Sequence, residues 1–164
     1  MSSNAERAAI LTRALRARID RDRSAISEIY TDGDKLQRIV SNILWNAAKF
    51  TKKGTVRVSA ALVQSSDESA AVALPKRLQP WERLLSLSIQ DTGIGIAEKD
   101  VAKIFQDFRQ AHAGSTRPYG GLGIGLTIAR RLTEILGGVI RVRSRLEEGS
   151  VFQVFVPVQA SVAS

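Results

Sequence analysis

The segment from Asp34 to Phe50 constrains the fold most, because one helical pattern places two different chemistries on its opposite sides. At about 100° per residue, Asn42, Asn46 and Lys49 fall within an arc of roughly 60°. Apolar side chains recur at helical spacing on the other side, at Leu36, Ile39, Val40, Ile43, Leu44 and Ala47. TDGD before the segment supplies a helix N-cap, and Gly54 follows its last turn. We therefore expect a long helix that buries one face and presents amides and an ammonium group on the other.

The rest of the chain alternates between helical and strand-like patterns. Helices are predicted over Ala5–Asp20, Ala97–Phe105 and Gly123–Leu136. Strands are predicted over Ala25–Tyr30, Val56–Leu62, Leu85–Asp91, Val139–Ser144 and Val151–Val158. A polar connection from Gln64 to Glu82 separates two of these strands, and Glu147–Gly149 forms the last hairpin turn. The order predicts an α+β fold, a two-layer α/β sandwich in which helices pack on one face of a mixed sheet.

Composition excludes several classes of site. The 164 residues include no Cys and a single His, His112, so disulfides, thiolate metal sites and multi-histidine metal sites are excluded. No apolar run approaches the roughly 18 residues that a membrane span needs, and the N-terminus does not resemble a secretory signal, so we expect a cytoplasmic protein. The net charge of +8 favours anionic partners or marks an ordinary solvated basic surface.

The stretch DTGIGI places Asp91 at the end of a predicted strand, before two glycines. A carboxylate there can accept a hydrogen bond from an exocyclic amine such as N6 of adenine, and Gly93 and Gly95 would let the backbone approach a flat ring. Ile94 and Ile96 would supply an apolar wall. A Gly-rich turn between strand and helix is the simpler alternative. An aspartic protease also carries Asp-Thr-Gly, but that class is almost wholly β, and the predicted helices argue against it.

A second Gly-rich stretch, YGGLGIGL, precedes the helix predicted from Gly123. Backbone amides free of side chains at a helix N-terminus form an anion site, although a flexible hinge would look the same. Its spacing matches neither the GxxxxGK[ST] nor the GxGxxG pattern. The preceding residues, Gln106–Tyr119, form a basic loop in which Arg109 and Arg117 would reach phosphate groups when the loop closes.

Taken together, these stretches resemble the ATP-binding catalytic domain of sensor histidine kinases, within the GHKL ATPase superfamily. NILWNAAKFT is similar to the N box, DTGIGI to the first glycine box, IFQDF to the phenylalanine box, GGLGIGL to the second glycine box and EEGSVFQVFVP to the closing strand motif. The resemblance covers about residues 34–157 and implies a Bergerat-type sandwich. It divides the chain into residues 1–33, a helix and short strand leading into the domain, 34–158, the ATP-binding catalytic domain, and 159–164, a tail.

The resemblance implies ATP and Mg²⁺ as cofactors and assigns roles to individual residues. Asn46 would be the metal ligand, while Asn42 and Lys49 would act with it on the phosphate side as the catalytic set. The loop between Phe108 and Tyr119 would be the ATP lid. The nucleotide would also contact Asn46, Lys49, Asp91, Gly93, Gly95, Ile96, Phe108, Arg117, Gly121, Leu122, Gly123, Gly125 and Leu126.

The implied activity is transfer of the γ-phosphate to a histidine on a separate dimerisation and phosphoacceptor domain, in the same parent chain or in trans, with a response regulator as the indirect partner. His112 is not followed by an acid, so we expect no phosphoacceptor in this chain. Hydrolases of the superfamily need a Glu where this chain has Asn42, and an amide is no base, so we expect slow hydrolysis. A nucleotide-binding module without transfer and a serine kinase remain alternatives. The 5% aromatic content argues against specific nucleic-acid binding.

Overall fold

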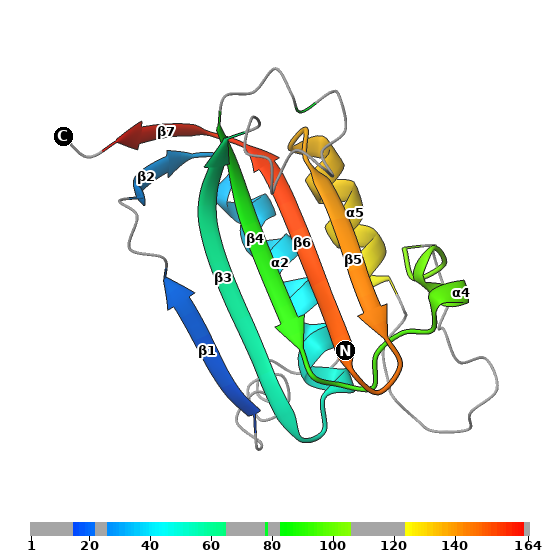
Figure 1. The fold of residues 1–164 in the computed structure, drawn as a ribbon. Coiled ribbons are helices and arrows are strands. Elements are labelled where there is room, and N and C mark those ends of the chain that lie inside the picture. The colour runs from blue at the N-terminus through cyan, green and yellow to red at the C-terminus, as the bar shows by residue number, and fades with distance from the viewer. Residues whose placement is uncertain (1–14, 22–25, 65–77, 79–82, 106–123, 163–164) are drawn as a thin grey trace.

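The computed structural model describes residues 15–21, 26–64, 78, 83–105 and 124–162. Its main element is a five-stranded sheet in the order β1-β3-β4-β6-β5 (Figure 1). The strands are β1 (Leu15–Arg21), β3 (Gly54–Gln64), β4 (Arg83–Asp91), β5 (Val139–Arg145) and β6 (Gly149–Pro157). β1 runs parallel to β3, and every other pairing in this sheet is antiparallel. The sheet is therefore mixed, as the sequence predicts.

Two long helices cover one face of the sheet. These are α2 (Gly33–Phe50) and α5 (Gly125–Ile135), which pack against each other behind β4, β6 and β5 in Figure 1. A single short turn of helix, α4 (Glu98–Val101), lies beyond the edge strand β5. A separate antiparallel pair joins β2 (Ile26–Tyr30) to β7 (Gln159–Val162). The predicted two-layer α+β sandwich is confirmed.

Helix α2 forms where the sequence predicts it, for local reasons that the structure makes visible. Asp32 caps its first turn by accepting a hydrogen bond from the backbone N–H of Lys35 at 3.0 Å. Ile39, Ile43 and Ala47 recur at helical spacing and are buried against the sheet. At the other end, the N–H of Thr51 donates to the carbonyl of Ala47 at 3.1 Å. The apolar stripe is thereby fixed toward the core, which leaves the polar stripe on the opposite side.

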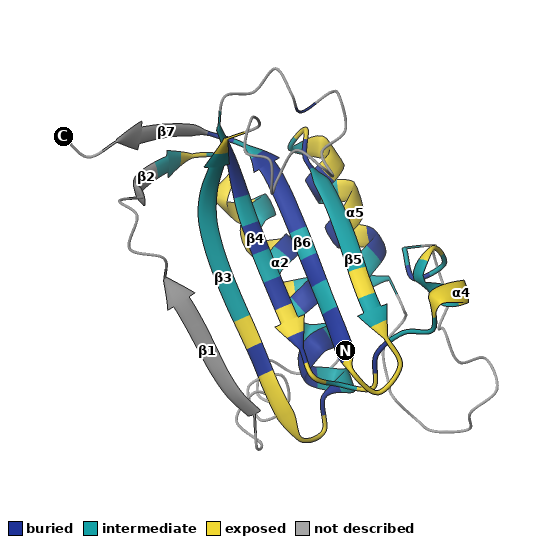
Figure 2. Cartoon of the chain, viewed as in Figure 1, coloured by how far each residue is buried: buried dark blue, intermediate teal, exposed yellow. Residues whose placement is uncertain are grey.

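The core lies between the helices and the central strands β4 and β6, and Figure 2 shows that these two strands are more buried than β3 and β5 on either side of them. Leu85, Leu87 and Ile89 project from β4, while Phe152 and Val154 project from β6. Strand β4 pairs along its whole length with β3 on one side, and from Leu84 to Asp91 with β6 on the other. Because β4 is a central strand, its last residue, Asp91, is buried at the end of the sheet.

The structure corrects part of the secondary-structure prediction. The helix predicted over Ala5–Asp20 is wrong for its second half, because Leu15–Arg21 is strand β1; residues 1–14 lie outside the described part of the chain. Leu15, Ala17 and Ile19 also recur at every second residue, which is the period of a strand, so the pattern fits a helix and a strand alike. Backbone pairing with β3 selects the strand. The helix predicted over Ala97–Phe105 is also shorter than expected, since only Glu98–Val101 is α-helical.

The ends of the chain contribute to the described structure more than the sequence predicted. Residues 159–162, which the sequence assigned to a tail, form β7 and pair with β2, the strand expected over Ala25–Tyr30. Strand β1, from the segment expected to lead into the domain, belongs to the main sheet. The domain boundaries themselves stay a prediction. No helix among the described residues is long and apolar enough to cross a membrane.

Candidate functional site

Four elements converge at one end of the sandwich. Strand β4 ends there at Asp91, helix α2 ends nearby at Phe50, and the hairpin between β5 and β6 turns at the same end (Figure 1). Backbone hydrogen bonds join them, because the N–H of Ile94 donates to the carbonyl of Phe50 at 3.2 Å and the N–H of Glu147 donates to the carbonyl of Ile94 at 2.8 Å. Residues that lie far apart in the sequence are thus held around the loop that follows Asp91.

Asp91 is a buried carboxylate, and its residue is only 5% exposed. It pairs with Val56 on β3 and with Ser150 on β6, so both neighbouring strands fix its position. Its Oδ1 accepts a hydrogen bond from the N–H of Gly93 at 2.9 Å. Burial raises the pKa of the Asp91 carboxyl, and hydrogen bonds from Gly93 and Ser150 oppose that rise. A carboxylate held in this way is a strong acceptor for a donor group that arrives from outside the fold.

The two glycines of this loop are required by the protein itself. A Cβ on Gly93 would lie 2.5 Å from the carbonyl oxygen of Phe50 and 2.8 Å from Oγ1 of Thr51. Gly95 has a φ of +67°, and a Cβ there would lie 1.8 Å from the carbonyl oxygen of Arg145. A side chain at either position would therefore collide with the chain itself, and the approach of this loop to a ligand stays a prediction.

The remaining polar groups of the loop are anchored to the hairpin. The N–H of Ile96 donates to Oγ of Ser144 at 2.8 Å, and that hydroxyl donates to the carbonyl of Gly149 at 2.8 Å. Oγ of Ser150 lies 2.9 Å from Oγ of Ser144. Ile96 packs against the main hydrophobic core, while Ile94 is exposed. The loop therefore has one defined path, in which Ile96 points into the core and Ile94 faces outward.

Helix α2 carries the three polar residues expected at the site, and all three are partly buried. Asn42 donates its Nδ2 to the carbonyl of Arg38 at 2.8 Å, within the same helix. The Nζ of Lys49 lies 5.1 Å from the centre of the Phe50 ring, and burial lowers the pKa of the Lys49 ammonium group. Asn46 occupies the turn between them. The predicted stripe of two amides and one lysine is thus present on this helix.

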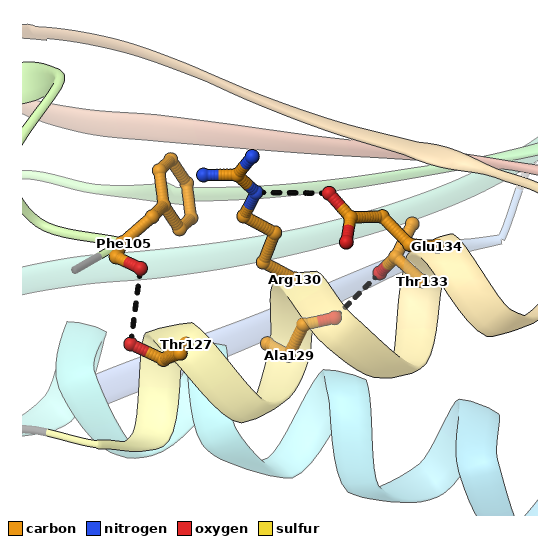
Figure 3. A network of polar contacts seen from close by, with 6 residues as sticks. All are labelled: Phe105, Thr127, Ala129, Arg130, Thr133 and Glu134. Atoms are coloured by element: carbon orange, nitrogen blue, oxygen red, sulfur yellow. Dashed lines mark hydrogen bonds and ion pairs between the residues drawn. The ribbon is translucent and has the colours of Figure 1, made fainter. Parts of the chain in front are cut away.

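Helix α5 begins beside this polar stripe. A Cβ on Gly125, its first residue, would lie 3.1 Å from Oδ1 of Asn42, so the backbone of α5 approaches the amide closely. Two residues later, the hydroxyl of Thr127 donates to the carbonyl of Phe105 at 3.1 Å (Figure 3). Figure 3 also shows Arg130 and Glu134, which pair at 2.9 Å on the same side of α5 as Phe105. Leu126 packs against the core.

Several predicted site residues lie outside the described part of the chain, which has a gap at residues 106–123. Their roles stay predictions, and the set comprises Phe108, Arg109, Arg117, Gly121, Leu122 and Gly123. Phe105 and Thr127 lie on either side of this gap in the sequence, and a hydrogen bond joins them.

Sequence reasoning missed three polar residues at this end of the sheet, namely Thr51, Ser144 and Ser150. Thr51 and Ser150 are buried, and Ser144 bonds to three different residues. Thr51 and Ser150 stand inside the quoted motifs NILWNAAKFT and EEGSVFQVFVP, but nothing in their residue type or spacing distinguished them from their neighbours. A polar residue at a position that the strand or helix pattern predicts to be buried is the signal that would have found them.

The donor set fits a purine nucleotide with its metal. Oγ1 of Thr51 is buried beside Asp91 and has no hydrogen-bond partner in the described structure, which leaves a polar group for a ligand to satisfy. Among the described residues no cluster of three or more His, Cys, Asp or Glu could hold a metal alone. Mg²⁺ usually takes one or two protein ligands and completes its shell with substrate phosphates and water, and an amide oxygen such as that of Asn46 suits it.

Comparison with known proteins gives a consistent result. Residues 31–160 match the model of the family described as histidine kinase-, DNA gyrase B-, and HSP90-like ATPases. The chain is 40% identical over 132 residues to the autoinducer 2 sensor kinase/phosphatase LuxQ of Vibrio vulnificus, which covers 80% of this chain and 14% of that protein. It is 39% identical over 137 residues to the sensor protein GacS of Pseudomonas syringae, and this match covers 79% of this chain and 14% of GacS.

A solved structure is similar as well. The full-length ShkA structure in complex with AMPPNP superposes with a TM-score of 0.69 at 26% identity, over 97% of this chain and 30% of that chain. The present chain thus spans about a seventh of the length of the two sensor proteins that it matches. The shared region is the part that contains the Asp91 loop and the polar stripe of α2.

Proposed function

This chain belongs to the family of histidine kinase-, DNA gyrase B- and HSP90-like ATPases, and from that premise we propose that it is the ATP-binding catalytic domain of a two-component sensor histidine kinase. In this proposal the domain transfers the γ-phosphoryl group of Mg·ATP to a histidine on a separate dimerisation and phosphoacceptor domain. The observation that carries the proposal is the buried Asp91 carboxylate, fixed at the end of β4 beside an unsatisfied hydroxyl and near the amide stripe of α2.

On the adenine side, Asp91 accepts a hydrogen bond from the 6-amino group. Two strands and the N–H of Gly93 hold the carboxylate in place, so the acceptor is positioned before the nucleotide arrives. Gly93 and Gly95 act indirectly, since they allow the loop to pack on Phe50 and on the hairpin. Ile96 belongs to the apolar floor of this pocket because its side chain packs against the core.

On the phosphate side, Asn46 is the protein ligand of Mg²⁺, and Lys49 contributes positive charge to the phosphates. Burial disfavours a lone charge on Lys49, so a bound polyphosphate would be its natural counter-ion. Asn42 positions the start of α5, at Gly125 and Leu126, because its Oδ1 faces the Gly125 backbone. The bound Mg·ATP supplies the phosphoryl group, and the described residues contribute orientation and charge neutralisation. Phe108, Arg117, Gly121, Leu122 and Gly123 would complete the lid.

Partners and location follow as parts of the same proposal. The phosphoacceptor domain lies in the parent chain or in a second chain, and a response regulator receives the phosphoryl group afterwards. The relatives LuxQ and GacS are sensor proteins about seven times as long as the matched region. We assign the domain to the cytoplasm, where ATP is available, and extend it over residues 34–158.

Phosphoryl transfer is tested by mixing the chain with Mg·ATP labelled at the γ-phosphate and isolated dimerisation hairpins from sensor kinases. We expect acid-labile label on a hairpin histidine, and little release of inorganic phosphate when no hairpin is present, because Asn42 cannot serve as a base. Nucleotide binding without label on any hairpin would support a module without transfer, whereas label on serine would support a serine kinase.

Two variants make the test specific for the site. Asp91→Ala should remove the preference for ATP over GTP while the chain remains folded, as circular dichroism would show. Arg57→Ala is a matched control on an exposed position of the neighbouring strand β3, and it should bind as the parent does. Calorimetry that records no saturable heat with Mg·ATP for the parent chain would overturn the proposed function.

A further inference from the structure

Thr51 has an unusual position at the end of α2. Its backbone N–H caps the helix by donating to the carbonyl of Ala47, but its side chain takes no part in that cap. The residue is only 2% exposed. Its Oγ1 is the single buried side-chain nitrogen or oxygen in the described part of the chain that lacks a hydrogen-bond partner. A buried polar atom of this kind has lost its hydrogen bonds to water without gaining one in the protein, which destabilises the fold. Its presence therefore needs an explanation.

The surroundings of this hydroxyl are rich in acceptors. Oγ1 of Thr51, Oδ1 of Asp91 and the carbonyl oxygen of Phe50 all lie within 2.9 Å of the point where a Cβ on Gly93 would stand. The hydroxyl is close enough to the Asp91 carboxylate to oppose the rise of its pKa. The methyl group of Thr51 lies on another side, toward Gly54. The hydroxyl therefore points to the same small region as Asp91.

We infer that the Thr51 hydroxyl is a second recognition group for the amino edge of adenine, which it contacts beside Asp91 either directly or through one water molecule. The inference rests on the function proposed above and adds a specificity-determining residue to it. A hydroxyl both donates and accepts, so it can accept from the second N–H of the 6-amino group or donate to the neighbouring ring nitrogen. Asp91, as an ionised acceptor, can serve only one of these roles.

A purely structural role accounts less well for the residue. Valine has nearly the shape of threonine, and it would fill a buried position without an unsatisfied oxygen. The extended backbone of Thr51 after the helix is also a conformation that valine accepts readily. Because the cap uses only the backbone N–H, the hydroxyl is not needed to end the helix. What the hydroxyl adds is a polar group beside the Asp91 carboxylate.

The test compares two nucleotides in three proteins. Mg·ATP and the triphosphate of purine riboside, which lacks the 6-amino group, are titrated by calorimetry into the parent, Thr51→Val and Thr51→Ser. The ratio of the two affinities measures how strongly the amino group is recognised. In Thr51→Val we expect this ratio to fall about 3- to 10-fold, the range for one neutral hydrogen bond. Thr51→Ser keeps the hydroxyl, so we expect the ratio of the parent.

Melting of the protein without nucleotide provides the second measurement. Because the hydroxyl is unsatisfied in the free chain, Thr51→Val should melt at the temperature of the parent or above it. A lower melting temperature, a failure to fold, or an equal loss of affinity for both nucleotides would assign the hydroxyl to the fold and overturn the inference. An unchanged ratio would overturn it as well, while leaving ATP binding intact. A parent chain that does not bind ATP would instead overturn both proposals at once.

Discussion

The first residue of α5, Gly125, packs directly against the amide of Asn42 on α2: a Cβ at Gly125 would stand 3.1 Å from Oδ1 of Asn42. The other end of that amide is held by the carbonyl of Arg38. This contact joins the N box to the second glycine box, which are about 80 residues apart in the sequence. It also means that any side chain at Gly125 must displace the amide by a few tenths of an ångström.

Gly125→Ala tests the functional weight of this contact. We expect the variant to stay folded, since alanine is favoured over glycine in a helix, but to bind Mg·ATP about 3- to 10-fold more weakly by calorimetry. Gly33→Ala is the matched control, because Gly33 also begins a helix and a Cβ there would meet nothing within 4 Å. If both variants bind as the parent does, the Asn42–Gly125 contact has no part in nucleotide binding.

The raised pKa of Asp91 predicts a definite pH dependence of stability. An acid whose pKa is higher in the folded state stabilises the fold while it is protonated, and this contribution is lost as the pH rises from its unfolded value, near 3.8, through its folded value. Asp91→Asn does not titrate. The free energy of unfolding of the parent minus that of the variant should therefore decrease with rising pH and become flat above the folded pKa. Urea denaturation between pH 4 and pH 8 measures this difference, and an increase with pH would contradict the prediction.

Metal dependence gives a separate prediction for Asn46. If its amide oxygen is the protein ligand of Mg²⁺, Asn46→Ala should weaken the binding of ATP when Mg²⁺ is present and change it little when EDTA removes the metal. The ratio of the affinity in Mg²⁺ to the affinity in EDTA should therefore fall. Calorimetry under both conditions gives the two affinities. Gln37→Ala is the matched control, as an exposed amide of the same helix. An unchanged ratio in Asn46→Ala would place the metal on other groups.

The sequence predicted the elements whose periodicity was long and unambiguous. Helix α2 and the central strand β4 appear within one or two residues of their expected bounds. Leu15–Arg21 was missed because its apolar residues satisfy two periods at once, and only pairing with the start of β3 selects between them. Asp91 was predicted as a carboxylate at the end of a strand, and the structure places it there in a buried position, while its role stays a prediction.

Other features of the site depend on what folds against them and were therefore beyond the reach of the sequence. Ser144 is one hydroxyl among several until the loop brings the N–H of Ile96 to it. The glycines are a second case, since their pattern indicated freedom to approach a ligand. In the fold, a Cβ on Gly93 would also stand 2.5 Å from the carbonyl oxygen of Phe50, so its lack of a side chain serves close backbone packing, which the pattern alone did not indicate.

Gly95→Ala should be strongly destabilising for that reason. Alanine at a φ of +67° costs about 1–2 kcal/mol in backbone strain, and its Cβ would also collide with the carbonyl of Arg145. Gly137→Ala is the matched control, because its φ of +75° imposes the same strain while its nearest neighbour, Cγ of Pro157, is 3.8 Å away. Urea denaturation should show a larger loss of the free energy of unfolding for Gly95→Ala, and equal losses would refute the collision.

Ser144→Ala isolates the anchor between the Asp91 loop and the hairpin. The substitution removes the acceptor for the N–H of Ile96 and one donor to the carbonyl of Gly149, so we expect a loss of about 1–3 kcal/mol in the free energy of unfolding. Because the freed N–H lies in the loop, hydrogen exchange at Ile96 should accelerate more than exchange in β4. Ser41→Ala, at an exposed position of α2, should be neutral or slightly stabilising. Unchanged exchange at Ile96 would show that the loop keeps its path without this hydroxyl, held by its other contacts with Phe50 and the hairpin.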